Sequence, residues 1–145
     1  MIRLSAKHLE EIERHAEREY PHECCGLLIG RIEDEGRTRV VVETYPVTNA
    51  WEETGERGHR MLIPPRDYMR AERLFSARHL GVVGDYHSHP DHPAVPSQFD
   101  LEHAPWPSMS YIVVSVRGGR AADLRSWEMD GERSRFDEEP IEKGD

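Results

Sequence analysis

Gly81-Val82-Val83-Gly84-Asp85-Tyr86-His87-Ser88-His89-Pro90 is the most informative stretch of the sequence. Its apolar beginning predicts a buried strand, and the histidines stand at the end of that strand. Alternate residues of a strand point to the same face, so His87 and His89 lie side by side, Asp85 shares their face and Ser88 is turned away. Two imidazoles placed in this way can bind one metal ion together.

A third ligand has to come from elsewhere in the chain, and Asp100 is the candidate. It follows His89 by eleven residues, after a loop that contains three prolines. Two neutral imidazoles and one carboxylate, with the fourth position left to water, form a ligand set typical of a catalytic zinc site. Ser97 and Asp100 also have the spacing of a helix start, with Ser97 as the cap and Asp100 in the first turn.

Taken together, these residues resemble the JAMM (MPN+) zinc metalloprotease family. The matching motif is His87-Ser88-His89-Pro90, six residues, Ser97, two residues and Asp100. The family also has a glutamate before a Cys-Gly strand, which corresponds here to Glu23 ahead of Cys24-Cys25-Gly26. The similarity extends from the first predicted helix to about Trp127, and it departs from the family at Asp85, where an apolar or aromatic residue is more common.

The resemblance implies a role for each of these residues. His87, His89 and Asp100 would bind one Zn²⁺ per chain, which lowers the pKa of a bound water to about 7. Glu23 would be the general base, and Ser97 would donate its hydroxyl to the oxyanion of the tetrahedral intermediate. No catalytic position of the family is missing, which favours an enzyme.

The hydropathy pattern predicts one α+β (mixed α/β) domain over residues 1–136, followed by a frayed acidic tail over 137–145. We expect a single central, mostly antiparallel β-sheet flanked by two main helices, and the resemblance implies the JAMM/MPN-like (cytidine deaminase-like) fold. The face of the second helix expected to be buried comprises Tyr68, Met69, Leu74 and Phe75. The predicted helices are 6–20 and 65–79, and the predicted strands are 23–30, 38–47, 59–63, 81–89, 111–116 and 121–129.

Composition excludes several classes of partner. The 19 Lys and Arg residues are outnumbered by 28 Asp and Glu residues, which gives a net charge of −9. Such a surface repels phosphate backbones and anionic lipids, so we expect neither nucleic-acid nor membrane binding. The near-apolar run at 24–30 is too short to span a bilayer. We therefore expect a cytoplasmic protein in which Cys24 and Cys25 stay reduced.

The resemblance also indicates the type of substrate. Members of the family hydrolyse amide or isopeptide bonds after the C-terminal Gly-Gly of ubiquitin or ubiquitin-like proteins. Only ten residues separate Asp100 from Tyr111, so this chain resembles the compact prokaryotic type. That type implies a ubiquitin-like (β-grasp) sulfur-carrier protein as substrate, for example one from which cysteine is released.

Two other functions also fit the sequence, which predicts no oligomeric state. One is an isopeptidase that removes ubiquitin-like tags from proteins (desampylase-like). The other is a non-catalytic zinc-binding interaction module, against which Glu23 argues because a scaffold needs no general base. The loop 48–58 is expected to touch the carrier tail, and Trp51 and Trp106 are expected to line the substrate channel or to pack in the core.

Overall fold

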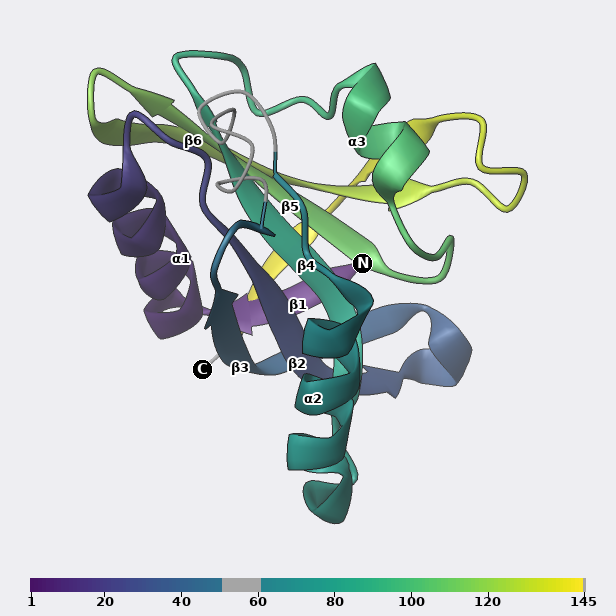
Figure 1. Ribbon diagram of the computed structural model, residues 1–145. Coiled ribbons are helices and arrows are strands. Elements are labelled where there is room, and N and C mark those ends of the chain that lie inside the picture. The colour runs from purple at the N-terminus through teal and green to yellow at the C-terminus, as the bar shows by residue number, and fades with distance from the viewer. Residues whose placement is uncertain (51–60, 145) are drawn as a thin grey trace.

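The histidine-bearing strand β4 (Gly81–Pro90) lies inside an eight-stranded sheet with the order β7-β6-β5-β4-β2-β3-β1-β8. The computed structural model describes residues 1–50 and 61–144 (Figure 1). The other strands are β1 (Ile2–Ser5), β2 (Cys25–Glu33), β3 (Thr38–Val47), β5 (Ser110–Arg117), β6 (Arg120–Met129), β7 (Phe136–Glu139) and β8 (Ile141–Gly144), and the helices are α1 (Ala6–Glu19), α2 (Pro65–Phe75) and α3 (Gln98–His103).

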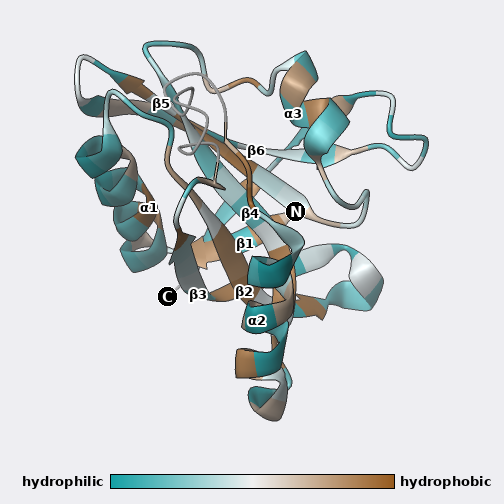
Figure 2. Cartoon of the chain, viewed as in Figure 1, coloured by the Kyte–Doolittle hydropathy of each residue, from teal (hydrophilic) through white to brown (hydrophobic). Residues whose placement is uncertain are grey.

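The two longer helices cover the sheet through two separate apolar clusters. On α1, Ile12 and Ala16 belong to a cluster that contains Leu28 of β2. On α2, Ala71 belongs to another cluster, which contains the adjacent Leu27. Neighbouring residues of a strand point to opposite faces, so the helices lie on opposite faces of the sheet. Figure 2 shows α1 hydrophilic over most of its surface, which agrees with an amphipathic helix packed by one face.

The central strands combine both kinds of pairing. β4 pairs antiparallel with β2 and parallel with β5. A parallel pair requires a crossover connection, and here α3 lies in that crossover, between β4 and β5. Four of the seven strand pairs are antiparallel, as expected, and the parallel pairs are β1 with β3, β1 with β8, and β4 with β5.

The segment after β6 differs from the expected frayed tail. Phe136–Glu139 pairs with β6, and Ile141–Gly144 pairs with β1. These two strands are the opposite ends of the strand order, yet only Pro140 separates them in sequence. Because one residue spans only about 3.8 Å, the sheet curls until its two edges meet at Pro140.

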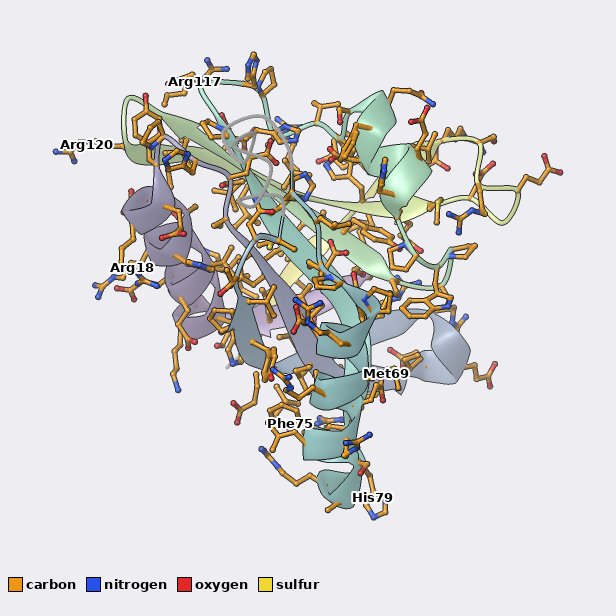
Figure 3. The ribbon with its side chains drawn as sticks, in the orientation of Figure 1. Arg18, Met69, Phe75, His79, Arg117 and Arg120 are labelled. Carbon is orange, nitrogen blue, oxygen red and sulfur yellow. The ribbon has the colours of Figure 1, made fainter. Side chains whose placement is uncertain are left out.

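Two further expectations need correction. Met69 and Leu74 of α2 are 62% and 60% exposed, while Tyr68 and Phe75 are buried as predicted. Figure 3 shows Met69 and Phe75 on opposite sides of the helix. The described part of the expected strand 59–63 is not a strand; instead, the Leu62 carbonyl accepts a hydrogen bond from the Ala50 N–H. Among the described residues, no helix is long and apolar enough to cross a lipid bilayer.

Candidate active site

One strand and one helix bring three ligand-type side chains to one point. His87 and His89 stand near the carboxyl end of β4, with their Nε2 atoms 3.1 Å apart. Asp100 of α3 places Oδ2 at 3.1 Å from Nε2 of His87 and 3.2 Å from Nε2 of His89. The predicted set of three therefore converges on one point.

The start of α3 positions the carboxylate. Ser97 is the N-cap residue, and its Oγ accepts a hydrogen bond from the Asp100 N–H at 3.1 Å. In return, the Ser97 N–H donates to Asp100 Oδ2 at 2.8 Å. This reciprocal capping box is the helix start that the spacing predicts, and it turns the same carboxylate oxygen toward the histidines.

The three atoms fit a zinc ion. With Zn–N and Zn–O distances of about 2.0–2.1 Å, two ligands of a tetrahedral ion lie about 3.3–3.4 Å apart. The observed separations of 3.1–3.2 Å are close to that value. The Nδ1 atom of His89 lies 3.0 Å from the carbonyl oxygen of Pro93. A carbonyl only accepts, so Nδ1 carries the hydrogen and the lone pair of Nε2 faces the other two ligands.

The electrostatics also favour a cation at this point. Burial lowers the pKa of His87, but the neighbouring Asp100 carboxylate outweighs burial and raises that pKa to about 9. Burial opposes ionisation of Asp100, but His87 and His89 hold the pKa of its carboxyl well below the usual range. The cluster therefore attracts either a proton or a metal ion, and the two compete.

Pairing between β2 and β4 brings Glu23 to the same place. Cys25 lies opposite His87, and the Cys24 N–H donates a hydrogen bond to Ser88 Oγ at 2.8 Å. Glu23, immediately before β2, is only 5% exposed. Its carboxylate and one ring nitrogen each of His87 and His89 lie within 4.8 Å of one another. A base at this position is close enough to reach a water bound between the histidines.

An apolar cavity of about 310 Å³ opens beside the ligands. His87 and Asp100 contribute to its wall, and Asp85 is a further polar group there. Asp85 accepts a hydrogen bond from the Tyr68 hydroxyl at 3.1 Å, and its burial raises its pKa to about 7. The aromatic residues of the wall are Tyr68, Phe99, Trp106, Tyr111 and Phe136.

The structure places the remaining candidates as follows. Trp106 lines the cavity and stacks edge-on against Tyr68, with ring centroids 5.4 Å apart. The loop 48–58 with Trp51 lies outside the described residues from position 51 onward. Both cysteines are buried free thiols, and burial raises the pKa of Cys24 to about 12, which argues against a nucleophilic role.

Tyr68 and Tyr111 are site residues that the sequence did not reveal. In sequence each looks like an ordinary apolar position of a helix or a strand. Tyr111 pairs with Asp85 across β4 and β5, and Tyr68 reaches Asp85 from α2. The packing of α2 over this face of the sheet brings the Tyr68 ring to the cavity, and the pairing of β4 with β5 brings the Tyr111 ring, so no local signal could have identified them.

Comparisons with known proteins show what this chain is similar to. Residues 5–130 match a family model described as prokaryotic homologs of the JAB domain. A desampylase of Haloferax volcanii is 36% identical over 102 residues, covering 70% of this chain and 68% of that protein. A CysO-cysteine peptidase of Mycobacterium tuberculosis is 33% identical over 113 residues, covering 78% of this chain and 72% of that protein.

A solved structure extends the similarity to nearly the whole chain. A protein of Desulfitobacterium hafniense, determined in solution, superposes with a TM-score of 0.83 at 32% sequence identity. The alignment covers 99% of this chain and 93% of that one. It therefore includes the two C-terminal strands as well as the segment that carries the ligands.

Proposed function

Because this chain belongs to the prokaryotic JAB-domain family of JAMM/MPN proteins, we propose that it is a zinc-dependent hydrolase of amide or isopeptide bonds. Its substrate is an adduct of a ubiquitin-like (β-grasp) sulfur-carrier protein, cut after the carrier's C-terminal Gly-Gly. The observation that carries the proposal is the convergence of His87, His89 and Asp100 within 3.2 Å, with the Glu23 carboxylate beside the two histidines. Two relatives are named for cleavage of this kind, a desampylase and a CysO-cysteine peptidase.

In this proposal, His87, His89 and Asp100 hold one Zn²⁺ per chain. A bound zinc ion supplies Lewis acidity, which makes hydroxide available near neutral pH. Glu23 takes the proton from the attacking water and delivers it to the leaving amine. The Ser97 hydroxyl donates a hydrogen bond to the developing oxyanion while its oxygen still accepts the Asp100 N–H.

Two leaving groups remain to be distinguished. A free cysteine would make the protein a peptidase of sulfur biosynthesis, whereas a protein lysine would make it a tag-removing isopeptidase. A zinc-binding module without turnover is the candidate of another class, and the buried Glu23 beside the ligands argues against it. The free thiols Cys24 and Cys25 support a cytoplasmic location as part of the proposal.

Mass spectrometry of the reaction products tests the function directly. The zinc-loaded protein is mixed with a sulfur carrier whose C-terminal Gly-Gly carries cysteine, and separately with a carrier joined to a lysine side chain. Release of either leaving group supports the proposal, provided that a chelator and Gly→Ala changes in the tail both abolish it. If a folded, zinc-loaded sample cleaves neither adduct, the binding-module alternative replaces the hydrolase.

The Glu23→Gln variant tests the assigned base. Because Glu23 is proposed as a base and not as a ligand, the variant should keep its zinc and lose about a hundred- to ten-thousand-fold in turnover. Zinc is measured by elemental analysis, and turnover by release of the leaving group. Glu132→Gln, at an exposed site, is the matched control and should behave as wild type. Loss of zinc in Glu23→Gln would instead make Glu23 a ligand.

A further inference from the structure

The backbone loop that orients His89 joins β4 to α3 and covers residues 91–97 (Figure 1). Within this loop, the Pro93 carbonyl accepts a hydrogen bond from Nδ1 of His89 at 3.0 Å. A metal ion on Nε2 leaves this bond in place, because the two ring nitrogens are separate binding positions. The direction of the His89 ring therefore depends on where the loop holds one carbonyl group.

Side chains from two other strands hold the peptide groups on either side of that carbonyl. The His92 carbonyl, one residue before Pro93, accepts the hydroxyl of Ser115 on β5 at 2.6 Å. The Ala94 carbonyl, one residue after Pro93, accepts the Nε1–H of Trp127 on β6 at 3.1 Å. Side chains of three strands thus bind three consecutive carbonyls, and the middle carbonyl is the one that orients the proposed ligand.

The position of Ser115 follows from the pairing of β4 with β5. Ser115 lies opposite His89 in the parallel register and is only 1% exposed, and Ala94 is buried as well. Buried carbonyl groups need hydrogen-bond donors, so pairing these carbonyls is a structural role in its own right. That role predicts a loss of stability alone when a donor is removed, whereas orienting His89 predicts a loss of metal affinity too.

The start of the loop is held separately from these two bonds. The Asp91 N–H donates to the Val116 carbonyl at 2.6 Å. The Asp91 carboxylate accepts the Tyr20 hydroxyl at 2.6 Å and the Gly118 N–H at 2.8 Å. The loop should therefore keep its start when the Ser115 or Trp127 donor is removed, and the change should be confined to the carbonyls near His89.

We propose that Ser115 and Trp127 are positioning residues that strengthen zinc binding by holding the Pro93 carbonyl against His89. Neither side chain is itself a metal ligand, and both act through the loop. A ring that already points toward the metal site loses less freedom on binding, so the affinity is higher. The inference rests on the zinc site of the proposed function and names residues outside the family motif that set its affinity.

The zinc affinities of Ser115→Ala and Trp127→Phe test this inference without any substrate. Each metal-free protein competes for zinc with a chromogenic chelator, and its thermal unfolding is recorded in parallel. Removing a partner that contacts a ligand directly costs about ten- to a hundredfold in metal affinity. Ser115 and Trp127 act one contact further away, so we expect each variant to lose about three- to tenfold.

Ser126→Ala is the matched control, because it removes a hydroxyl that is equally buried and lies outside this loop. Ser126 is 0% exposed, and its hydroxyl donates to Glu139 at 2.9 Å. The control should lose stability, as Ser115→Ala does, and keep the wild-type affinity for zinc.

Nitrogen NMR of the histidine side chains gives a second readout in the zinc-loaded proteins. With Nε2 bound to zinc, Nδ1 of His89 carries the only N–H of that ring, so its exchange with water reports on the Pro93 bond. We expect faster exchange in Ser115→Ala and Trp127→Phe than in wild type, and the wild-type rate in Ser126→Ala.

The outcomes separate this inference from the proposed function. Wild-type zinc affinity in folded Ser115→Ala or Trp127→Phe overturns the role of that residue and leaves the hydrolase intact. An equal loss of affinity in Ser126→Ala overturns the inference too, because affinity would then follow stability alone. If the wild-type protein binds no zinc, the proposed function fails, and the inference that rests on it fails as well.

Discussion

At the scale of single residues, the site depends on the Asp100 carboxylate, whose orientation is fixed by contacts within the protein. Asp100 Oδ2 receives the Ser97 N–H and faces both histidine Nε2 atoms. His89 is oriented from its far side by the Pro93 carbonyl. These backbone contacts fix the directions of two of the proposed ligands, which lowers the cost of ordering them around a metal ion.

The pKa of His87 predicts how zinc binding depends on pH. In the metal-free protein this pKa is about 9, because the Asp100 carboxylate outweighs the lowering effect of burial. His87 therefore carries a proton below pH 9, and zinc must displace it, since only a neutral imidazole binds a metal. Zinc affinity should rise about tenfold per pH unit between pH 6 and 8 for each proton displaced.

Calorimetry at pH 7.5 in buffers of different ionisation enthalpy measures the number of protons displaced. We expect the release of about one proton or more for each zinc bound. A heat of binding that does not change with the buffer would show that no proton leaves, and it would contradict the protonated state assigned to His87.

The convergence of His87, His89 and Asp100 could be predicted from the sequence because these residues are local in the chain. His87 and His89 follow from strand alternation, and Asp100 follows from the spacing of a helix start. The convergence of these three agrees with the prediction, whereas the catalytic roles of Glu23 and Ser97 stay predictions. Tyr68, by contrast, reaches the site only through the packing of α2, which no local pattern records.

At the scale of elements, α2 shows where apolar periodicity alone misleads. Tyr68, Ala71 and Phe75 form its buried face, and the spacing of three and four residues is that of one helix stripe. Met69 and Leu74 are apolar too, but they fall outside this stripe and are exposed. All four residues are apolar, so their hydrophobicity alone did not indicate which of them face the sheet.

The difference in burial between Phe75 and Leu74, two adjacent residues of α2, can be tested by substitution. Phe75 is 8% exposed and packs edge-on against Tyr45, with ring centroids 6.2 Å apart. Phe75→Ala should lower the free energy of unfolding by about 3–5 kcal/mol. Leu74→Ala, one position earlier, should change it by less than about 0.5 kcal/mol. Denaturant titration measures both, and equal losses in the two variants would contradict the orientation of the helix.

Three short strands, β1, β7 and β8, escaped prediction for a different reason. β1, β7 and β8 contain four residues each, and β7 reads Phe-Asp-Glu-Glu. Four residues are too few for a pattern to indicate a strand, and β7 and β8 also lack the apolar alternation that β1 shows in Ile-Arg-Leu-Ser. They form because strands distant in sequence offer backbone N–H and C=O groups for hydrogen bonding. A local sequence pattern does not indicate this long-range pairing.

At the scale of the whole molecule, the curled sheet joins its two ends through a buried carboxylate. Glu139 of β7 is 4% exposed and accepts a hydrogen bond from Ser126 Oγ of β6 at 2.9 Å. Its other oxygen lies 3.5 Å from Nη1 of Arg39, which stands on β3. The Arg39 Nε donates in turn to the Ser108 carbonyl at 2.9 Å, at the end of the crossover that carries α3.

Glu139→Gln should therefore destabilise the fold. The substitution removes the buried one of the two carboxylates beside Arg39 and leaves only the more exposed Glu128, at 3.3 Å, so the loss should approach the cost of breaking a buried ion pair, about 3–5 kcal/mol. Glu138→Gln is the matched control, because Glu138 is exposed and pairs with an exposed arginine. Thermal unfolding should separate the two variants clearly. Identical melting temperatures would mean that Glu139 does not hold the sheet edges together.

In the proposed function, one zinc ion held by His87, His89 and Asp100 makes this protein a hydrolase. The most direct test is a titration of the chelator-treated protein with zinc while release of the leaving group from a Gly-Gly carrier adduct is followed. We expect no release without metal and a rise that saturates at about one zinc per chain. His92→Ala, at an exposed neighbouring histidine, should saturate in the same way, and His89→Ala should not recover. Release by the metal-free protein, or full recovery by His89→Ala, would contradict zinc-dependent hydrolysis at this site.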